Sequence, residues 1–582
     1  MTQIAILADV HFHDVYGDYD FEGPVIPRTG KRANARTLKD TVNSTRIFNE
    51  NYFALFAVLD DLAARGIKHV VLVGDYSDDG QRSTIAGLKV ILDKYRQQHG
   101  MAFYATIGNH DVRTPVGDHH DKRFLNADGS HTLVTSSASM KASGPQVVTD
   151  KMFGLGYRDA MLAMADAGFF PQEHFLHWET PFGTRADLEA RQFDITSPDG
   201  SVTRKVIDGS YLVEPFEGVW IVAIDANVYE PKDGAFAADD PKGYEESTDA
   251  GWNAMLRHKP FILEWLADVR RRAQAGGKKI LVFSHYPVVD FLRGTVEDEE
   301  ALFGATGFVR RSPAVVASEA FARTGIALHF SGHLHVNALG LHEGEQSTLV
   351  NVAMPSLVGY PPAYKIVTLD DDDVRLETVI IRDVPHFDDL LGLYRQELAR
   401  LDEGHNPLLD ARTYYDFIRA HMTELVSHRY LPKEWPRELR SLVECLTVRD
   451  LVRLAGMAEP VRAEDALAHL AAERGEGGAS DPMRHVTFKD MVVDWYRLRH
   501  ASDLAFSDIG HDRIALYREV IAALKPRRGG GGVQGQLALF AGIMEAYLDG
   551  PATCHLTIET ASGAVRPLEM AENRDSVVRS VA

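Results

Sequence analysis

Hydrophobic residues in the first part of the chain alternate between short continuous runs and longer stretches with helical spacing. Runs at Ile4–Ala8, His69–Val73 and Ala102–Ile107 predict strands. Between them, apolar residues recur at helical spacing over Tyr52–Ala64 and Ile85–Tyr95, which predicts two helices. Strands that alternate with helices in this way are typical of a sheet with helices packed against its faces.

This alternation stops near Arg113 and returns only after Ser210. Residues 113–210 are rich in Gly, Asp, Ser and His, and their periodicity is weak. A structureless loop of that length is unusual inside a compact domain. We therefore interpret residues 113–210 as an insertion with short elements of its own, which could form a cap.

Strand-like runs return after the insertion. They lie at Val219–Ile224, Ile280–Phe283, Ile326–Phe330, Thr348–Ala353, Tyr364–Leu369 and Val374–Ile381. The first two are separated by an amphipathic stretch, Phe261–Ala273, which predicts a helix. Four adjacent acidic residues, Asp370–Asp373, separate the last two runs and predict a solvated hairpin turn.

The pattern changes again after about Pro385. From Phe387 to Leu548 the chain is rich in Leu, Ala, Glu and Arg with helical periodicity. A glycine-rich stretch, Lys525–Gln536, predicts a flexible loop, and His555–Ile558 could be a late strand. We therefore predict two domains, residues 1–385 and a mostly α-helical C-terminal domain over residues 386–582.

Composition narrows the class of protein. The 582 residues are 45% hydrophobic and 25% charged, which is ordinary globular usage. The net charge of −21 excludes a basic surface over the whole molecule, so nucleic acid is not the expected partner. The two cysteines cannot build a disulfide framework, and no apolar run approaches the ~20 residues of a membrane helix. The apolar run Gln3–Ala8 predicts a strand that leads directly into the polar motif at Asp9. We therefore expect no signal peptide and a cytoplasmic location.

Five short polar segments each follow a predicted strand. They are Asp9-Val10-His11, Gly74-Asp75-Tyr76-Ser77-Asp78, Gly108-Asn109-His110-Asp111, His285, and Gly332-His333-Leu334-His335. Taken alone, the first two segments are common turns and His285 is a core or surface histidine, whereas Asn109-His110 and His333-Leu334-His335 are rarer combinations. In open α/β sheets, however, ligands bind outside the carboxyl ends of the strands, so the ordered set should converge on one edge.

The residue types in these segments suit metal ions. Asp, His and Asn side chains bind ions such as Mn, Fe and Zn, and one carboxylate can bridge two cations. Glycines before Asp75, Asn109 and His333 allow tight turns that direct the next side chain at the metals. Seven ligand-type residues exceed the three or four of a single site, so we predict two divalent or transition-metal ions.

The order DVH, GDYSD, GNHD, H and GHLH resembles the calcineurin-like metallophosphoesterase superfamily over about residues 1–385, apart from the insertion. The resemblance implies a four-layer α/β (α+β) fold, in which helices flank a central β-sandwich of two mixed sheets. It also implies which residues hold the two metals: Asp9, His11 and His335 the first, Asn109, His285 and His333 the second, and Asp75 both.

The same resemblance assigns catalytic roles. His110 would contact the phosphate and protonate the leaving oxygen, and Asp78 would orient His110. A hydroxide held between the two cations would attack phosphorus in line.

The substrate is less constrained than the chemistry. The segment Ser356–Pro361 (SLVGYP) is similar to bacterial phosphodiesterases of the cyclic-nucleotide type, which favours a phosphodiesterase acting on a small nucleotide-like substrate. A phosphomonoesterase or a nucleoside-diphosphate hydrolase would use the same metals. A nuclease is disfavoured because the net charge repels a polyanion, and a metal-bound scaffold without activity is disfavoured because no ligand position is lost.

Some polar residues outside the motifs need separate interpretations. Arg46, Asn49, Glu50 and Asn51 could reach the mouth of the site, but helix capping with exposed charge is the simpler interpretation. Three histidines of the insertion are expected to be exposed rather than ligands: His119, His120 and His131. The C-terminal helices could join copies of the chain into a homo-oligomer.

Overall fold

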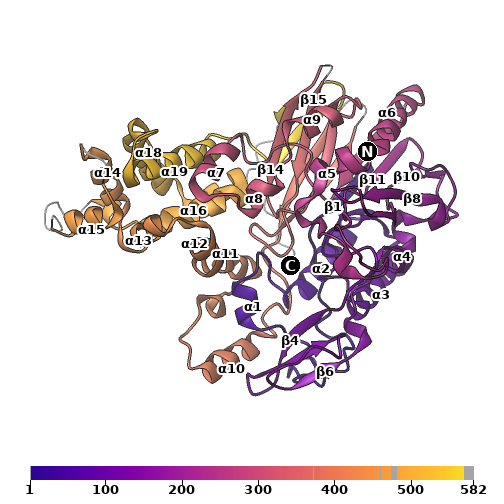
Figure 1. Ribbon diagram of the computed structural model, residues 1–582, viewed down its shortest axis with the longest axis horizontal. Coiled ribbons are helices and arrows are strands. Elements are labelled where there is room, and N and C mark those ends of the chain that lie inside the picture. The colour runs from indigo at the N-terminus through magenta and orange to yellow at the C-terminus, as the bar shows by residue number, and fades with distance from the viewer. Residues whose placement is uncertain (1, 346, 371–372, 459–460, 473–480, 569–582) are drawn as a thin grey trace.

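Two seven-stranded sheets form the centre of the protein (Figure 1). The computed structural model describes residues 2–345, 347–370, 373–458, 461–472 and 481–568. The first sheet contains β1 (Thr2–Leu7), β2 (His69–Val73), β3 (Ala102–Thr106), β16 (Ala363–Leu369), β17 (Asp373–Ile380), β18 (His555–Glu559) and β19 (Val565–Pro567), in the order β19-β18-β17-β16-β1-β2-β3. The second contains β7 (His177–Glu179), β10 (Tyr211–Phe216), β11 (Val219–Ile224), β12 (Lys279–Ser284), β13 (Leu328–Ser331), β14 (Ala338–Glu343) and β15 (Thr348–Ala353), in the order β14-β15-β13-β12-β11-β10-β7.

Both sheets are mixed. β1, β2 and β3 are parallel neighbours, as are β11, β12, β13 and β15, whereas the remaining pairs are antiparallel. β2 and β11 read as continuous apolar runs because both faces of these strands are covered. Side chains of the two sheets belong to one hydrophobic core, so the predicted sandwich of mixed sheets is confirmed.

Helices cover the sandwich where the pattern predicts them. α2 (Asn51–Ala64) and α3 (Arg82–His99) join the first three strands, and α6 (Pro260–Ala275) lies between β11 and β12. α3 ends at Gly100, whose left-handed backbone closes the last turn (φ 66°). The predicted hairpin is the antiparallel pair β16–β17, although residues 371–372 of its acidic turn lie outside the described residues.

Residues 113–210 contain several short elements. β4 (Asp121–Leu125), β5 (His131–Thr135) and β6 (Gln146–Val148) form a small sheet, and β8 (Gln192–Thr196) pairs with β9 (Thr203–Ile207) as a hairpin. β7 instead pairs with β10 at the edge of the second sheet. Part of this segment therefore belongs to the sandwich itself.

The C-terminal region is mostly helical, as predicted. Its larger helices are α10 (Leu391–Leu401), α11 (Tyr414–Leu425), α13 (Arg437–Cys445), α14 (Val448–Gly456), α15 (Ala463–Ala472), α16 (Phe488–Ala501), α18 (His511–Leu524) and α19 (Gly532–Leu548). The helices from α11 onward lie together beside the sandwich, whereas α10 lies near β4 (Figure 1). The glycine-rich loop prediction is wrong at its end, because α19 starts at Gly532 and buries Val533.

Many contacts join the C-terminal region to the sandwich domain, and two of them show how the two regions are connected. The described strand β18 pairs with β17, and Arg499 of α16 forms a buried ion pair with Glu299 of α7 (Val296–Phe303). No helix in the described ranges has the length and apolar character that would carry it across a bilayer.

Candidate metal centre

The predicted ligands converge where strands of both sheets end. Asp9, Asp75 and Asn109 follow β1, β2 and β3, while His285 follows β12 and the two remaining histidines follow β13. All are buried: even Asn109, the most accessible of them, has an exposed fraction of 8%. The topology thus places carboxylates, imidazoles and an amide from distant parts of the chain in one enclosed space.

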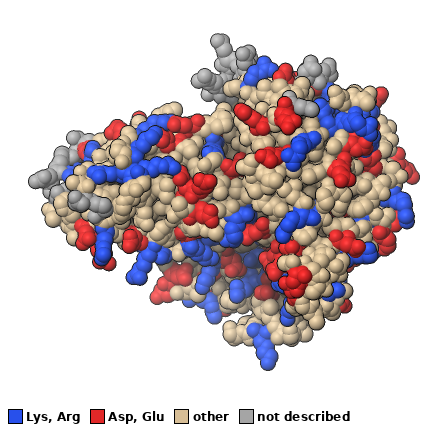
Figure 2. Space-filling model, turned by 45° about the horizontal axis from the view of Figure 1, so that its top comes forward, with Lys and Arg blue, Asp and Glu red and all other residues tan. Residues whose placement is uncertain are grey.

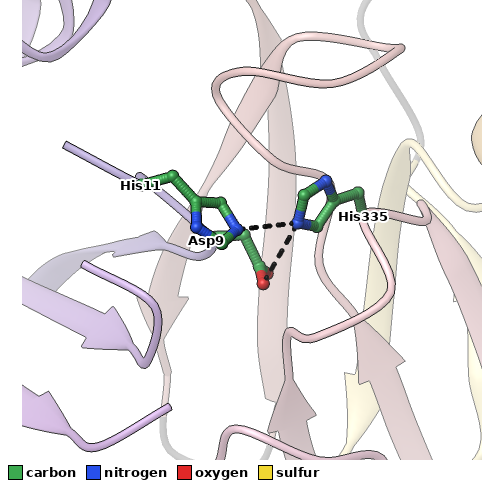
Figure 3. A group of neighbouring side chains, drawn as sticks. All are labelled: Asp9, His11 and His335. Atoms are coloured by element: carbon green, nitrogen blue, oxygen red, sulfur yellow. Dashed lines mark hydrogen bonds and ion pairs between the residues drawn. The ribbon is translucent and has the colours of Figure 1, made fainter. Parts of the chain in front are cut away.

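The first group of ligand atoms comprises Asp9, His11 and His335 (Figure 3). The Nε2 atoms of His11 and His335 are 3.0 Å apart, and Nε2 of His335 lies 3.5 Å from Oδ1 of Asp9. Oδ2 of Asp75 lies 3.7 Å from Nε2 of His11. These four side chains therefore face one another.

The second group surrounds His285. Its Nε2 atom lies 3.1 Å from Oδ1 of Asn109, 3.3 Å from Oδ2 of Asp75 and 3.3 Å from Nδ1 of His333. Oδ2 of Asp75 is consequently near ligand atoms of both groups, which is the position that a bridging carboxylate requires.

The donor atoms of both groups fit metal ions. Ligand atoms held about 2.0–2.2 Å from one ion are separated by roughly 3 Å or slightly more, as these are. His285 donates its Nδ1–H to the carbonyl oxygen of Val73 (3.0 Å), and Asn109 donates its amide to Thr248 (3.3 Å). These hydrogen bonds turn the lone pairs of His285 Nε2 and Asn109 Oδ1 toward the carboxylate of Asp75. The three groups together form a cluster of acceptors that a cation would stabilise.

The pKa values agree with this interpretation. Burial lowers the pKa values of His11 and His333 well below their ordinary range, so both are neutral, as metal ligands must be. Burial also opposes protonation of His285, but the Asp75 carboxylate beside it raises the pKa of His285 to about 9. In the metal-free chain a proton on His285 thus provides positive charge where a metal ion would provide it.

The ligand backbone is unusual in a way that the sequence does not reveal. Five of the seven ligands have left-handed backbone: Asp9 (φ 51°), His11 (φ 44°), Asp75 (φ 49°), His333 (φ 76°) and His335 (φ 53°). Non-glycine residues adopt this conformation rarely, and each instance costs on the order of 1–3 kcal/mol. Such strain is typical of functional sites, where the surrounding structure holds a side chain in a required direction.

The glycines of the motifs provide space for neighbouring ligands. A Cβ atom at Gly108 would lie 2.1 Å from Oδ1 of Asp75, and one at Gly332 would lie 2.5 Å from Oδ2 of Asp9. Gly74 also has a positive φ of 77°, whereas Gly108 and Gly332 do not. A turn also begins at Gly108, since the backbone N–H of Asp111 donates to its carbonyl oxygen (3.3 Å). Glycine is required at Gly74 by its positive φ, and at Gly108 and Gly332 by the close approach of a neighbouring carboxylate.

The residues around His110 differ from the prediction in one respect. Nδ1 of His110 lies 2.6 Å from Oδ1 of Asp79, not beside Asp78. Asp78 instead accepts hydrogen bonds from Arg36, Arg46 and Lys122. The backbone of Asp79 is left-handed (φ 72°), which turns its side chain away from that of Asp78 and toward the histidine.

Several predicted surface residues are in fact buried parts of the site. Asn51 accepts a hydrogen bond from the backbone N–H of His13 (3.0 Å) and donates to the carbonyl oxygen of His11, so it holds the first motif in place. His120 of the insertion lies 3.0 Å from Oδ2 of Asp79, while His119 and His131 are exposed as expected. Arg46 is also buried, with an exposed fraction of 9%.

Comparisons with known proteins bear on the family of this domain. Residues 2–151 match the family model of calcineurin-like phosphoesterases, and no curated protein matches the chain. Solved structures to which the chain is similar include a dimetal phosphatase from Danio rerio (12% identity, TM-score 0.34, covering 65% of this chain and 95% of that one) and GAP50, the anchor in the inner membrane complex of Plasmodium (10% identity, TM-score 0.25, covering 65% and 84%). The family match at residues 2–151 and the ligand set at the strand ends support the calcineurin-like metallophosphoesterase superfamily for this part of the protein.

Proposed function

We propose that this protein hydrolyses phosphodiester bonds in small nucleotide-like molecules with the help of two divalent ions, of which Mn, Fe and Zn suit the ligands. The observation that supports a small substrate is the enclosure of the site. The ligands are buried, whereas the side chain of His110 is 30% exposed and marks the accessible side. A flexible polymer would need a longer open groove.

Each residue has a definite task in this proposal. Bound ions would supply an activated water molecule and hold the phosphate oxygens. Asp79 accepts a hydrogen bond from Nδ1 of His110, which leaves Nε2 of His110 to deliver a proton to the leaving oxygen. Ser356 donates to the carbonyl oxygen of Asp9 (2.7 Å), so the segment that resembles cyclic-nucleotide phosphodiesterases packs against the first ligand.

Charge supports a small substrate over a nucleic acid. The chain carries a net charge of −21, and acidic and basic side chains are interspersed on the face that Figure 2 shows. A polyanion would be repelled at long range by such a protein. A cytoplasmic location and a homo-oligomer formed through the C-terminal helices stay predictions.

A substrate panel tests the proposal. Protein loaded with manganese should hydrolyse bis-p-nitrophenyl phosphate faster than p-nitrophenyl phosphate, and a panel of cyclic nucleotides and dinucleotides should contain a better substrate. Faster hydrolysis of the monoester would favour a phosphomonoesterase. Metal-loaded protein that hydrolyses neither ester would favour the scaffold alternative.

A further inference from the structure

Arg46 lies beside the metal centre although it belongs to none of the strand-end motifs. It occupies the loop between α1 (Leu38–Val42) and α2. Its Nη2 atom is 3.3 Å from Nδ1 of His110, whose ring packs edge-on against that of His11 with the centroids 5.0 Å apart. One aromatic ring therefore separates this guanidinium from a predicted metal ligand.

Asp78 fixes the orientation of Arg46. Its Oδ1 atom accepts hydrogen bonds from both Nε (3.1 Å) and Nη2 (2.7 Å) of Arg46. These contacts occupy one edge of the guanidinium. Nη1 of Arg46 has no hydrogen-bond partner in the part of the chain that the structure describes, so this donor is available to a ligand.

Arg46 is not needed to neutralise Asp78. The other carboxylate oxygen, Oδ2, already accepts hydrogen bonds from Lys122 and from Arg36 (3.3 Å). Lys122 is itself buried, so its attraction to Asp78 is weakly screened. Arg46 is thus a third cation on this carboxylate. Its Nη2 atom also lies 3.6 Å from Oδ1 of Asp79, but neither contact uses Nη1.

An anion at the metal centre would explain this arrangement. A guanidinium close to divalent cations is repelled by them, and the repulsion is largest where water is excluded. A phosphate group that contacts both the ions and the guanidinium removes this repulsion. Hydrogen bonds from a charged guanidinium to phosphate oxygens are also stronger than those between neutral groups.

We propose that Arg46 is a substrate-contacting residue, which donates hydrogen bonds from Nη1 to a phosphate oxygen of the substrate. This inference rests on the proposed function, because it takes a phosphate group as the ligand of the centre. Asp78 is then a positioning residue for Arg46 rather than for His110.

Binding of inorganic phosphate tests the inference without turnover. The affinity of manganese-loaded protein for phosphate is measured by calorimetry for the wild type, Arg46→Gln and Arg46→Lys, together with the metal content. We expect a loss of about 10–100-fold for Arg46→Gln, the range for a hydrogen bond to a charged group, with a smaller loss for Arg46→Lys and unchanged metal content.

Arg36 provides the matched control. It also binds Asp78 and stacks on the same Phe48 ring (4.0 Å, against 5.4 Å for Arg46), but it makes no contact with His110. Arg36→Gln should bind phosphate with an affinity close to that of the wild type. An equal loss in Arg36→Gln and Arg46→Gln would assign the effect to the Asp78 cluster and overturn the inference.

The inference and the proposed function fail in different ways. If Arg46→Gln binds phosphate as tightly as the wild type, the inference is overturned, whether or not esters are hydrolysed. If phosphate binding depends on Arg46 but no ester in the panel is hydrolysed, the inference stands and the proposed function fails.

Discussion

Nδ1 of His110 lies 2.6 Å from Oδ1 of Asp79, and the opposite oxygen of the same carboxylate lies 3.0 Å from Nε2 of His120. Asp79 thus holds one histidine of the GNHD motif and one histidine of the insertion. The carboxylate of its neighbour Asp78 accepts hydrogen bonds from Arg36, Arg46 and Lys122. The two adjacent carboxylates therefore differ in their nearest partners, which are two imidazoles for Asp79 and two guanidinium groups and an ammonium group for Asp78.

The first prediction concerns His110. His110→Ala should retain its metals and lose turnover by about 10²–10⁴-fold, because it removes the proton donor. The loss should be larger for an alkyl ester than for a p-nitrophenyl ester, since p-nitrophenolate leaves without a proton. Metal content and the rates for both ester types check this. Equal losses for the two esters, or loss of metal, would contradict the assigned role.

Asp79→Asn should reproduce this pattern in a weaker form. The amide still accepts a hydrogen bond from His110 but no longer stabilises its positive charge, so turnover should fall less than in His110→Ala. The measurement is again the ratio of rates for the two ester types. A loss confined to KM, with that ratio unchanged, would show that Asp79 does not act through His110.

The second prediction concerns metal stoichiometry. Asp75 lies near both ligand groups, whereas Asn109 lies in one. Asp75→Asn should weaken both sites, because a negative charge is lost and an amide nitrogen does not coordinate. Asn109→Ala should weaken one. Metal analysis after reconstitution should give two ions per chain for the wild type, and loss of a single ion in both variants would refute the bridging position.

The third prediction concerns the space at Gly108. A methyl group there would lie 2.1 Å from Oδ1 of Asp75, so Gly108→Ala should displace that carboxylate and reduce metal content. Gly392 in α10 is a suitable control, since a Cβ atom at this glycine meets no other atom within 4 Å. Gly392→Ala should keep both metals and be as stable as the wild type, or more stable by up to about 1 kcal/mol. The metal content and thermal unfolding of both variants check this prediction. Full metal content in Gly108→Ala would contradict it.

The fourth prediction concerns pH and Glu50. One oxygen of Glu50 accepts a hydrogen bond from Tyr394 (3.1 Å), the other is buried without a partner, and burial raises the pKa of Glu50 to about 7. The unfolded chain loses this proton near the ordinary value of 4.5, whereas the folded protein retains it to about 7. The contribution of Glu50 to stability should therefore decrease as the pH rises through this window, by an amount on the order of 3 kcal/mol.

Glu50→Gln removes the titrating group and should flatten this dependence. Thermal unfolding of metal-free protein at pH 5 and pH 8 should show a smaller difference in the variant than in the wild type. Glu22 is the control, because its side chain is 89% exposed and Glu22→Gln should leave the difference unchanged. A Glu50→Gln variant with the pH dependence of the wild type would rule out this cause.

The positions of the metal ligands could be predicted because strands covered on both faces give continuous apolar runs. β2 is of this kind, and the motif that contains Asp75 follows directly where this strand ends. The partner of His110 could not be predicted. Asp78 and Asp79 are identical side chains one residue apart, and the left-handed backbone of Asp79 decides which of them reaches His110.

The interpretation of Arg46 failed for a different reason. Charged residues before a helix are usually exposed, and nothing near Arg46 in the sequence indicates that Asp78 and Lys122 close around it. Lys122 belongs to the insertion, and the weak periodicity of this segment does not predict which of its residues point toward the site. The burial of Arg46 is therefore determined by contacts between segments far apart in the sequence, which the local pattern does not show.

The pairing of β18 with β17 has a consequence for synthesis on the ribosome. β17 ends at Ile380 and β18 begins only at His555, so the edge of the first sheet stays unpaired while the intervening helices are made. At about 5–20 residues per second, this interval lasts on the order of 10–30 s. During it, β17 presents free backbone groups in a segment that alternates valine and leucine with charged residues. The charged residues on β17 would then limit association between nascent chains until β18 arrives.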